Sequence, residues 1–195
     1  MAIIHQAQLT PSKPELLRSF LDARPWGEPG EMEVLGAYRF DDPAGEVGVE
    51  CHVVRVGEVV LHVPLAYRGA PVDGAEEHLV GTMQHSVLGE RFVYDGAHDE
   101  VALDCFRRAL CGEQEQAPLE IVDAEGRRVA AREQSVVLSL EVDTGAELPS
   151  AEQILGGEPF SIARTVDQLD GTVRLRATWH DGDGVVAAFG DGSES

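Results

Sequence analysis

Apolar residues near the start of the chain recur at helical spacing. Ser12 and Glu15 have the spacing of a capping box, and Pro14 stands where the first turn of a helix tolerates proline. The residues that follow would share one helical face: Leu16, Leu17, Phe20 and Leu21. The pattern predicts a helix of about three turns. The proline- and glycine-rich segment 24–30 should end it, because neither residue continues a helix well.

The pattern then becomes that of β-strands. Strands are predicted over residues 33–40, 47–56 and 59–67, where β-branched residues are frequent. Gly57 and Glu58 suit a two-residue hairpin turn, because glycine readily adopts the positive φ that such turns require.

The hairpin turn also sets the register of the two strands around it. Val56 should face Val59, and His52 should face Val63. His52 and His62 then point to opposite faces of the sheet, because side chains alternate along a strand. We therefore expect that the two histidines do not share a metal ion.

A second hairpin and a second helix follow. Strands are predicted over 82–87 and 91–94, and a helix over 99–110 that ends at Gly112. Arg107 and Arg108 stand in its last turn, where positive charge complements the helix dipole. One side of this helix is apolar: Ala102, Leu103, Phe106, Ala109 and Leu110.

The rest of the chain is predicted to be mostly strand: 119–122, a turn at 124–126, 128–142, 160–166, 173–180 and 185–189. The fold class expected is α+β, with antiparallel β-sheets and two main helices packed on one side. We expect residues 1–111 to form a first region and 112–118 a connection. Residues 119–190 should form a β-rich region continuous with the same fold, and 191–195 a disordered tail.

Charge limits the classes of partner. The 195 residues carry 35 acidic and 15 basic side chains, a formal net charge of −20. Such a surface should repel phosphate backbones and anionic lipid heads, so no nucleic acid and no membrane partner is expected. No apolar stretch is long enough to span a membrane, and the first residues lack a signal-peptide pattern. We therefore expect a cytoplasmic protein.

The use of lysine, asparagine, arginine and cysteine narrows the chemistry further. Lys13 is the single lysine, and asparagine is absent. A kinase needs a strand lysine over the phosphates and an asparagine that holds metal, so the sequence argues against phosphoryl transfer. The preference for arginine indicates a GC-rich bacterial genome. Cys51, Cys105 and Cys111 do not have the pattern of a disulfide framework, and we expect Cys51 and Cys105 to be buried thiols.

Other candidate sites are weak. His78 and His85 lack a metal-binding spacing, and the loop 180–184 lacks the closing glutamate of a calcium site. Ser86 follows His85 directly, but neighbouring strand residues point to opposite faces and cannot pair as nucleophile and base. No catalytic residue, metal site or cofactor is expected.

Several separated blocks of the first 111 residues resemble the N-terminal cap of bacterial maltokinases, and most closely its stand-alone, cap-like relatives. The blocks are residues 4–7 with Pro11-Ser12-Lys13, the helix from Leu16 to Trp26, 38–50, 63–71, 81–89, 91–96, and His98-Asp99. The resemblance implies a cap without the catalytic residues of the kinase. It also implies a context of trehalose, maltose and glycogen metabolism.

The resemblance favours a non-catalytic accessory module that acts on a separately encoded sugar kinase or glucan enzyme. Arg68, His85 and Tyr94 are the residues expected to contact a ligand or partner, because they have polar ends near strand termini. A homo-oligomer is also compatible with the sequence.

Two alternatives stay open. The first is a small-ligand binder for a sugar or sugar phosphate, with Trp26, Tyr67, Tyr94 and Trp179 available for stacking on a sugar face. The second is an enzyme of unrecognised class.

Overall fold

The computed structural model describes residues 2–4, 9–122, 128–131, 133–155 and 160–190. The helices are α1 (Lys13–Asp22), α2 (Glu100–Leu110) and α3 (Ala151–Leu155), with two 3-10 turns, η1 (Glu76–His78) and η2 (Gly96–His98). The predicted turn at 124–126 and the tail 191–195 lie outside the described residues.

The main sheet of the described chain has six strands in the order β2-β6-β7-β5-β4-β3, and all its pairs are antiparallel. Its strands are β2 (Leu9–Thr10), β3 (Met32–Asp41), β4 (Gly48–Val56), β5 (Val59–Arg68), β6 (Leu79–His85) and β7 (Gly89–Asp95). The predicted hairpin register is confirmed, since Val56 pairs with Val59 and His52 with Val63. Gly57 has a φ of 60°, as the turn requires.

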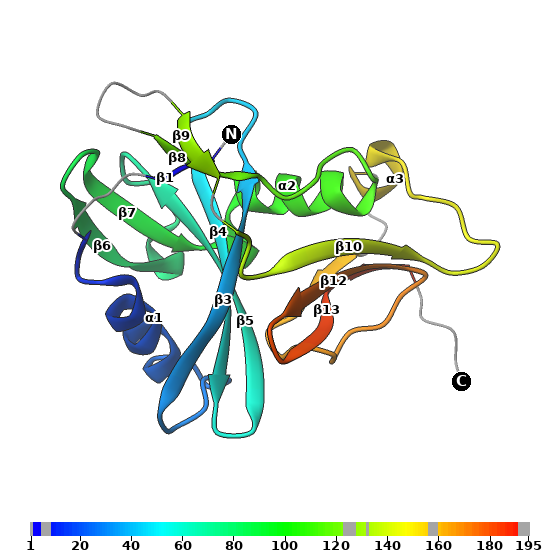
Figure 1. Cartoon of the computed structure of the whole chain (residues 1–195), viewed down its shortest axis with the longest axis horizontal. Coiled ribbons are helices and arrows are strands. Elements are labelled where there is room, and N and C mark those ends of the chain that lie inside the picture. Colours follow the sequence, from blue (N-terminus) through cyan, green and yellow to red (C-terminus); the bar gives the residue numbers. More distant parts are fainter. Residues whose placement is uncertain (1, 5–8, 123–127, 132, 156–159, 191–195) are drawn as a thin grey trace.

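Two smaller sheets complete the described fold (Figure 1). One has the order β10-β12-β13-β11 and is antiparallel, with β10 (Val137–Val142), β11 (Phe160–Ile162), β12 (Val173–Trp179) and β13 (Gly182–Phe189). The other joins β1 (Ala2–Ile4) in parallel to β8 (Leu119–Val122), which pairs with β9 (Arg128–Ala131). The α+β class with antiparallel sheets is therefore confirmed.

Both predicted helices form where expected. Ser12 and Glu15 make the full capping box before α1, and Asp99 caps α2 by accepting hydrogen bonds from the amides of Val101 and Ala102. Gly112 follows α2 with a φ of 72°. Local chemistry therefore determines where these helices begin and end.

The placement of the two helices on one side was wrong, because they pack on opposite faces of the six-stranded sheet. Apolar residues of α1 join one face of the sheet in a single cluster: Leu16, Leu17, Phe20, Leu21, Val54, Val56, Leu61, Val63, Leu65, Met83 and Val93. Those of α2 join the other face, among them Cys105 and Phe106 with Cys51 and Val53. Both faces of the central strands are apolar, so the sheet needs a cover on each side.

The predicted strand 128–142 is divided between two sheets. Between its two parts, the Ser135 hydroxyl bonds the edge of β3, where it accepts from the Ala37 amide at 3.0 Å and donates to the Ala37 carbonyl at 3.2 Å. The chain then continues as β10 in the four-stranded sheet, and Val136 is fully buried in the α2 cluster. The same cluster holds residues of β12 and β13. The division of the chain at 112–118 stays a prediction.

A short segment after β11 connects the two large sheets. One edge of β5 pairs with β7 over Leu65–Arg68, in the second half of the strand. Along the first half of β5, the same edge forms hydrogen bonds with this segment. His62 donates its amide hydrogen to the Arg164 carbonyl, and Val166 donates to the Val60 carbonyl, both at 2.9 Å. The Ala163 amide donates to Val186 in β13 at 2.9 Å. The segment therefore bonds both sheets.

The three cysteines are buried and free. Burial raises the pKa of Cys51 and raises that of Cys105 to about 11, so these thiols stay protonated and unreactive at neutral pH. Within the described chain, no helix is long and apolar enough to cross a membrane.

The packing around Phe106 gives a test of the fold. This fully buried side chain makes edge-to-face contacts with Phe40 at 5.3 Å and His62 at 5.9 Å. Phe106→Ala should lower the free energy of unfolding by about 3–5 kcal/mol, because it leaves a cavity between α2 and the sheet. Urea denaturation measures the loss. Asp104→Ala on the outer side of α2 is the control and should cost less than about 1 kcal/mol.

Candidate functional site

The structure brings Arg68 and Tyr94 near one another and leaves His85 apart. The Arg68 guanidinium donates from Nε to the Asp99 carboxylate at 2.7 Å, and this bond raises the pKa of Arg68. The Tyr94 hydroxyl accepts from the Val72 amide at 2.9 Å. Both side chains therefore fix the chain between β5 and α2. Their contact with a ligand or partner stays a prediction.

His85 lies at the opposite end of the β6–β7 hairpin from Tyr94. Its Nδ1 accepts hydrogen bonds from the amides of Val87 and Leu88 at 3.2 and 3.1 Å. These two bonds shape the hairpin turn.

The four aromatic residues considered for sugar stacking do not form one platform. Trp26 and Tyr67 pack against the α1 cluster, whereas Tyr94 and Trp179 belong to the α2 cluster on the other face of the sheet. Sequence spacing did not reveal this, because the face of each aromatic depends on long-range packing.

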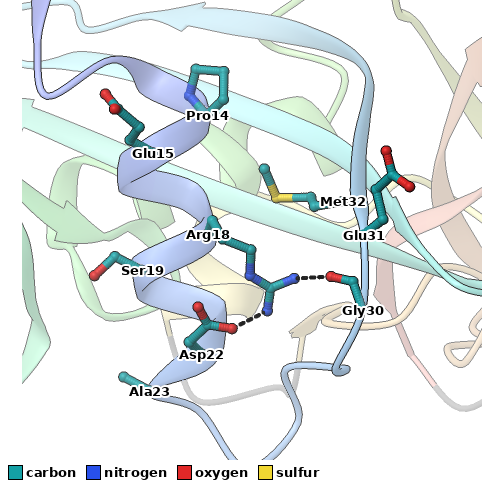
Figure 2. Close-up of a pocket in the computed structure, with 9 residues that line it drawn as sticks. All are labelled: Pro14, Glu15, Arg18, Ser19, Asp22, Ala23, Gly30, Glu31 and Met32. Atoms are coloured by element: carbon teal, nitrogen blue, oxygen red, sulfur yellow. Dashed lines mark hydrogen bonds and ion pairs between the residues drawn. The ribbon is translucent and has the colours of Figure 1, made fainter.

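A shallow groove runs between α1 and the start of β3, with a volume of about 810 Å³. Its lining residues are Pro14, Glu15, Arg18, Ser19, Asp22, Ala23, Gly30, Glu31 and Met32 (Figure 2). Arg18 lies at its centre, where Nη2 pairs with Asp22 at 2.6 Å and Nη1 donates to the Gly30 carbonyl at 3.3 Å. Arg18 thus holds the segment after the helix against α1.

The groove is acidic. It holds three carboxylates, those of Glu15, Asp22 and Glu31, against the single guanidinium of Arg18. Glu15 also accepts hydrogen bonds from the Ser12 side chain and backbone, which lower its pKa and keep it ionised. A positively charged group would therefore be attracted to this groove.

A partly buried ion cluster anchors α1 beside the groove. One oxygen of the Glu50 carboxylate pairs with the Lys13 ammonium. The other oxygen accepts hydrogen bonds from Arg39 Nη2 at 3.0 Å and from Arg39 Nε at 3.2 Å. His52 Nε2 lies 3.6 Å from Glu50 Oε2. Only a tenth of the Glu50 side chain is exposed. The cluster therefore connects α1, β3 and β4.

The charges of this cluster are well defined. Burial alone would raise the pKa of Glu50, but His52, Lys13 and Arg39 outweigh it and hold that pKa well below its ordinary value. Burial lowers the pKa of His52 to about 4 against the attraction of Glu50. At neutral pH the carboxylate is ionised and the imidazole neutral, so these groups hold the helix rather than exchange protons.

Sequence reasoning missed this cluster, although a signal was present. Glu50 is a charged residue within the apolar strand 47–56, and alternation places it on the same face as His52 and Val54. A charge on a buried strand face requires partners. Among the described residues, no group of three or more His, Cys, Asp or Glu side chains could hold a metal ion.

The ion cluster makes a pH-dependent contribution to stability. Glu50→Gln should lower the free energy of unfolding at pH 7 by about 1–3 kcal/mol, because it leaves Lys13 and Arg39 without their carboxylate. Because folding lowers the pKa of Glu50, the ionised carboxylate stabilises the folded protein at pH values above its ordinary pKa of 4.5. This stabilisation is lost progressively as pH falls below 4.5. The difference from the wild type should therefore narrow as pH falls below 4.5, as urea denaturation at several pH values would show. A difference that stayed constant with pH would contradict this account.

Comparison with known proteins identifies part of the chain. The family model of the maltokinase N-terminal cap domain matches residues 20–99, which include the end of α1, strands β3 to β7, and η2. No curated protein and no solved structure matches the chain. The sequence blocks and the family match agree over this part of the chain, so residues 20–99 are similar to the maltokinase N-terminal cap domain.

Proposed function

We propose that this chain is a non-catalytic accessory module that binds a separately encoded sugar kinase or glucan-acting enzyme. The match of residues 20–99 to the maltokinase N-terminal cap domain carries the proposal. The context of trehalose, maltose and glycogen metabolism belongs to the same proposal.

The position of the single lysine supports a non-catalytic role. In kinases a strand lysine lies over the nucleotide phosphates. Lys13 instead begins α1, bonds Glu50, and lies 5.8 Å from the centre of the Tyr67 ring. Its ammonium is committed to holding the helix on the sheet.

The acidic groove beside α1 supports an interaction role. The α2 side of the main sheet is covered by the four-stranded sheet, with which it shares one cluster of buried residues. The outer side of α1 bears the groove, with exposed Glu15, Ser19 and Glu31. A partner that presents arginine or lysine side chains would complement the three carboxylates there.

The groove predicts which variants should weaken partner binding. Ser19→Arg places a positive charge between the carboxylates, so affinity for a basic partner should fall roughly tenfold or more. Ser139→Arg is the matched control, because it makes the same change on an exposed residue of β10, and it should leave affinity unchanged. The partner is first identified by co-purification with the tagged chain and mass spectrometry, and affinity is then measured with purified proteins.

One result would contradict the accessory role, and another would contradict the groove as its binding surface. The accessory role would be contradicted if no enzyme of sugar metabolism were enriched above a control bait. The other concerns the surface alone: equal losses for Ser19→Arg and Ser139→Arg would exclude the groove while leaving the accessory role intact.

Enzyme assays give a second test. The purified chain with ATP, magnesium and maltose should form no more ADP than the same mixture without maltose, because Lys13 is held by Glu50 and the chain has no asparagine to bind the metal. A coupled ADP assay measures this. Maltose-dependent ADP formation by the chain alone would overturn the non-catalytic role.

A further inference from the structure

A second polar cluster lies where β7 ends and the segment after β11 begins. Arg164 Nη2 pairs with Asp95 Oδ2 at 2.6 Å, and only 4% of the Asp95 side chain is exposed. The Arg164 guanidinium lies 4.8 Å from the centre of the Trp26 ring. Residues from three distant parts of the sequence thus converge here, and this cluster is separate from the groove beside α1.

Two histidines lie at the same place. The rings of His78 and His98 stack with centres 4.1 Å apart and planes within 4° of parallel. Gly96 fixes the position of η2, since a Cβ there would come within 2.9 Å of the Pro64 backbone. The tight packing of η2 on β5 therefore holds His98 in place.

Arg24 adds a further positive charge. Its guanidinium lies 4.7 Å from the centre of the Phe20 ring, and Phe20 packs edge-on against Trp26 at 5.6 Å. Neither an ion pair nor a hydrogen-bond partner for Nε is found for Arg24 among the described residues. Buried Nη1 of Arg164 also has no partner there.

The balance of charge at this place differs from that of the chain. Arg24, Arg164, His78 and Asp95 all lie near enough to His98 to shift its pKa, so two guanidinium groups stand near one buried carboxylate in a chain whose net charge is −20. Asp95 already accepts from Arg164 and from the Ala97 amide at 3.2 Å. Asp95 neutralises one guanidinium group, so the charge of the second is left for an anion to neutralise.

We propose that Arg24, Arg164, His78 and His98 form a binding site for a small phosphate monoester. Guanidinium and protonated imidazole groups form strong, charge-assisted hydrogen bonds with phosphate oxygens. Trp26 and Phe20 support the two guanidinium groups through cation–π contacts, which hold them ready without neutralising their charge. The site goes beyond the proposed accessory role and does not depend on it.

Phosphate binding should strengthen as pH falls. Burial lowers the pKa of His98, and the nearby charges of His78, Arg164 and Arg24 lower it further, whereas Asp95 opposes them. A bound dianion would favour protonated His98, so affinity should rise between about pH 8 and pH 6.5, above the second pKa of the ester at about 6. Glu77, 3.6 Å from His78, is a further carboxylate beside the ring pair.

The full chain can be titrated with glucose 6-phosphate, inorganic phosphate and glucose at constant ionic strength, by NMR of the Trp26 indole and the histidine rings. Both phosphates should shift these signals, and glucose should not. A response to glucose 6-phosphate alone would still support the site and show that the sugar contributes. Equal shifts with chloride, or none at millimolar phosphate, would overturn the proposal.

Variants separate a built site from general attraction of anions. Arg24→Gln should weaken phosphate binding roughly tenfold. His98→Gln should remove the rise in affinity for the phosphate ester as pH falls. Arg107→Gln is the matched control, because Arg107 also lies over an aromatic ring, 5.5 Å from the centre of Phe160. Equal weakening by Arg107→Gln would overturn the proposal. Circular dichroism checks that each variant folds. Because His98 is exposed, His98→Gln provides a test even if Arg24→Gln does not fold.

Discussion

The shared edge of β5 is the constraint on which the rest of the structure depends. The second half of this edge pairs with β7, and the first half bonds the segment around Arg164, which also bonds β13. Buried His62 strengthens the contact, because Nδ1 donates to the Ala163 carbonyl at 3.1 Å while Nε2 accepts from the Tyr38 hydroxyl at 2.8 Å. Burial lowers the pKa of His62 to about 3, so the ring stays neutral and satisfied at neutral pH. One strand edge thus aligns the two large sheets and positions Arg164 beside Asp95.

The two sides of the main sheet are held by different forces. On the α2 side, aromatic and aliphatic residues pack against the four-stranded sheet in one large cluster. On the α1 side, a smaller apolar cluster is joined by the Lys13, Glu50 and Arg39 ion cluster at the start of the helix. A short helix such as α1 buries little apolar area. Ion pairs that are largely shielded from water therefore help to hold α1 on the sheet. The placement of α1, and with it the acidic groove, therefore depends on charge as well as on packing.

Local features were predictable from the sequence, and long-range features were not. The capping box at Ser12, the Asp99 cap and the Gly57 turn each act within a few residues, and each was confirmed. The face on which α2 packs depends on β4, β12 and β13, which are distant from the helix in sequence, and no local pattern reveals such contacts. The same reason explains why Arg164 was not connected with Asp95 and why Glu50 was not recognised as an ion-pair centre. In each case the partner is distant in sequence, and only the register of the sheet brings it near.

The match to the cap domain ends at residue 99, yet the structure that covers this region continues beyond it. The helix that follows, α2, and the strands β12 and β13 bury the sheet face that carries Cys51 and Val53. That face is therefore unavailable to a partner enzyme in this chain. The helix on the opposite face is α1, whose outer side carries exposed carboxylates and the groove. If the cap binds a kinase or a glucan enzyme, contact through the α1 side follows from this arrangement, because the other side is already occupied by the chain itself.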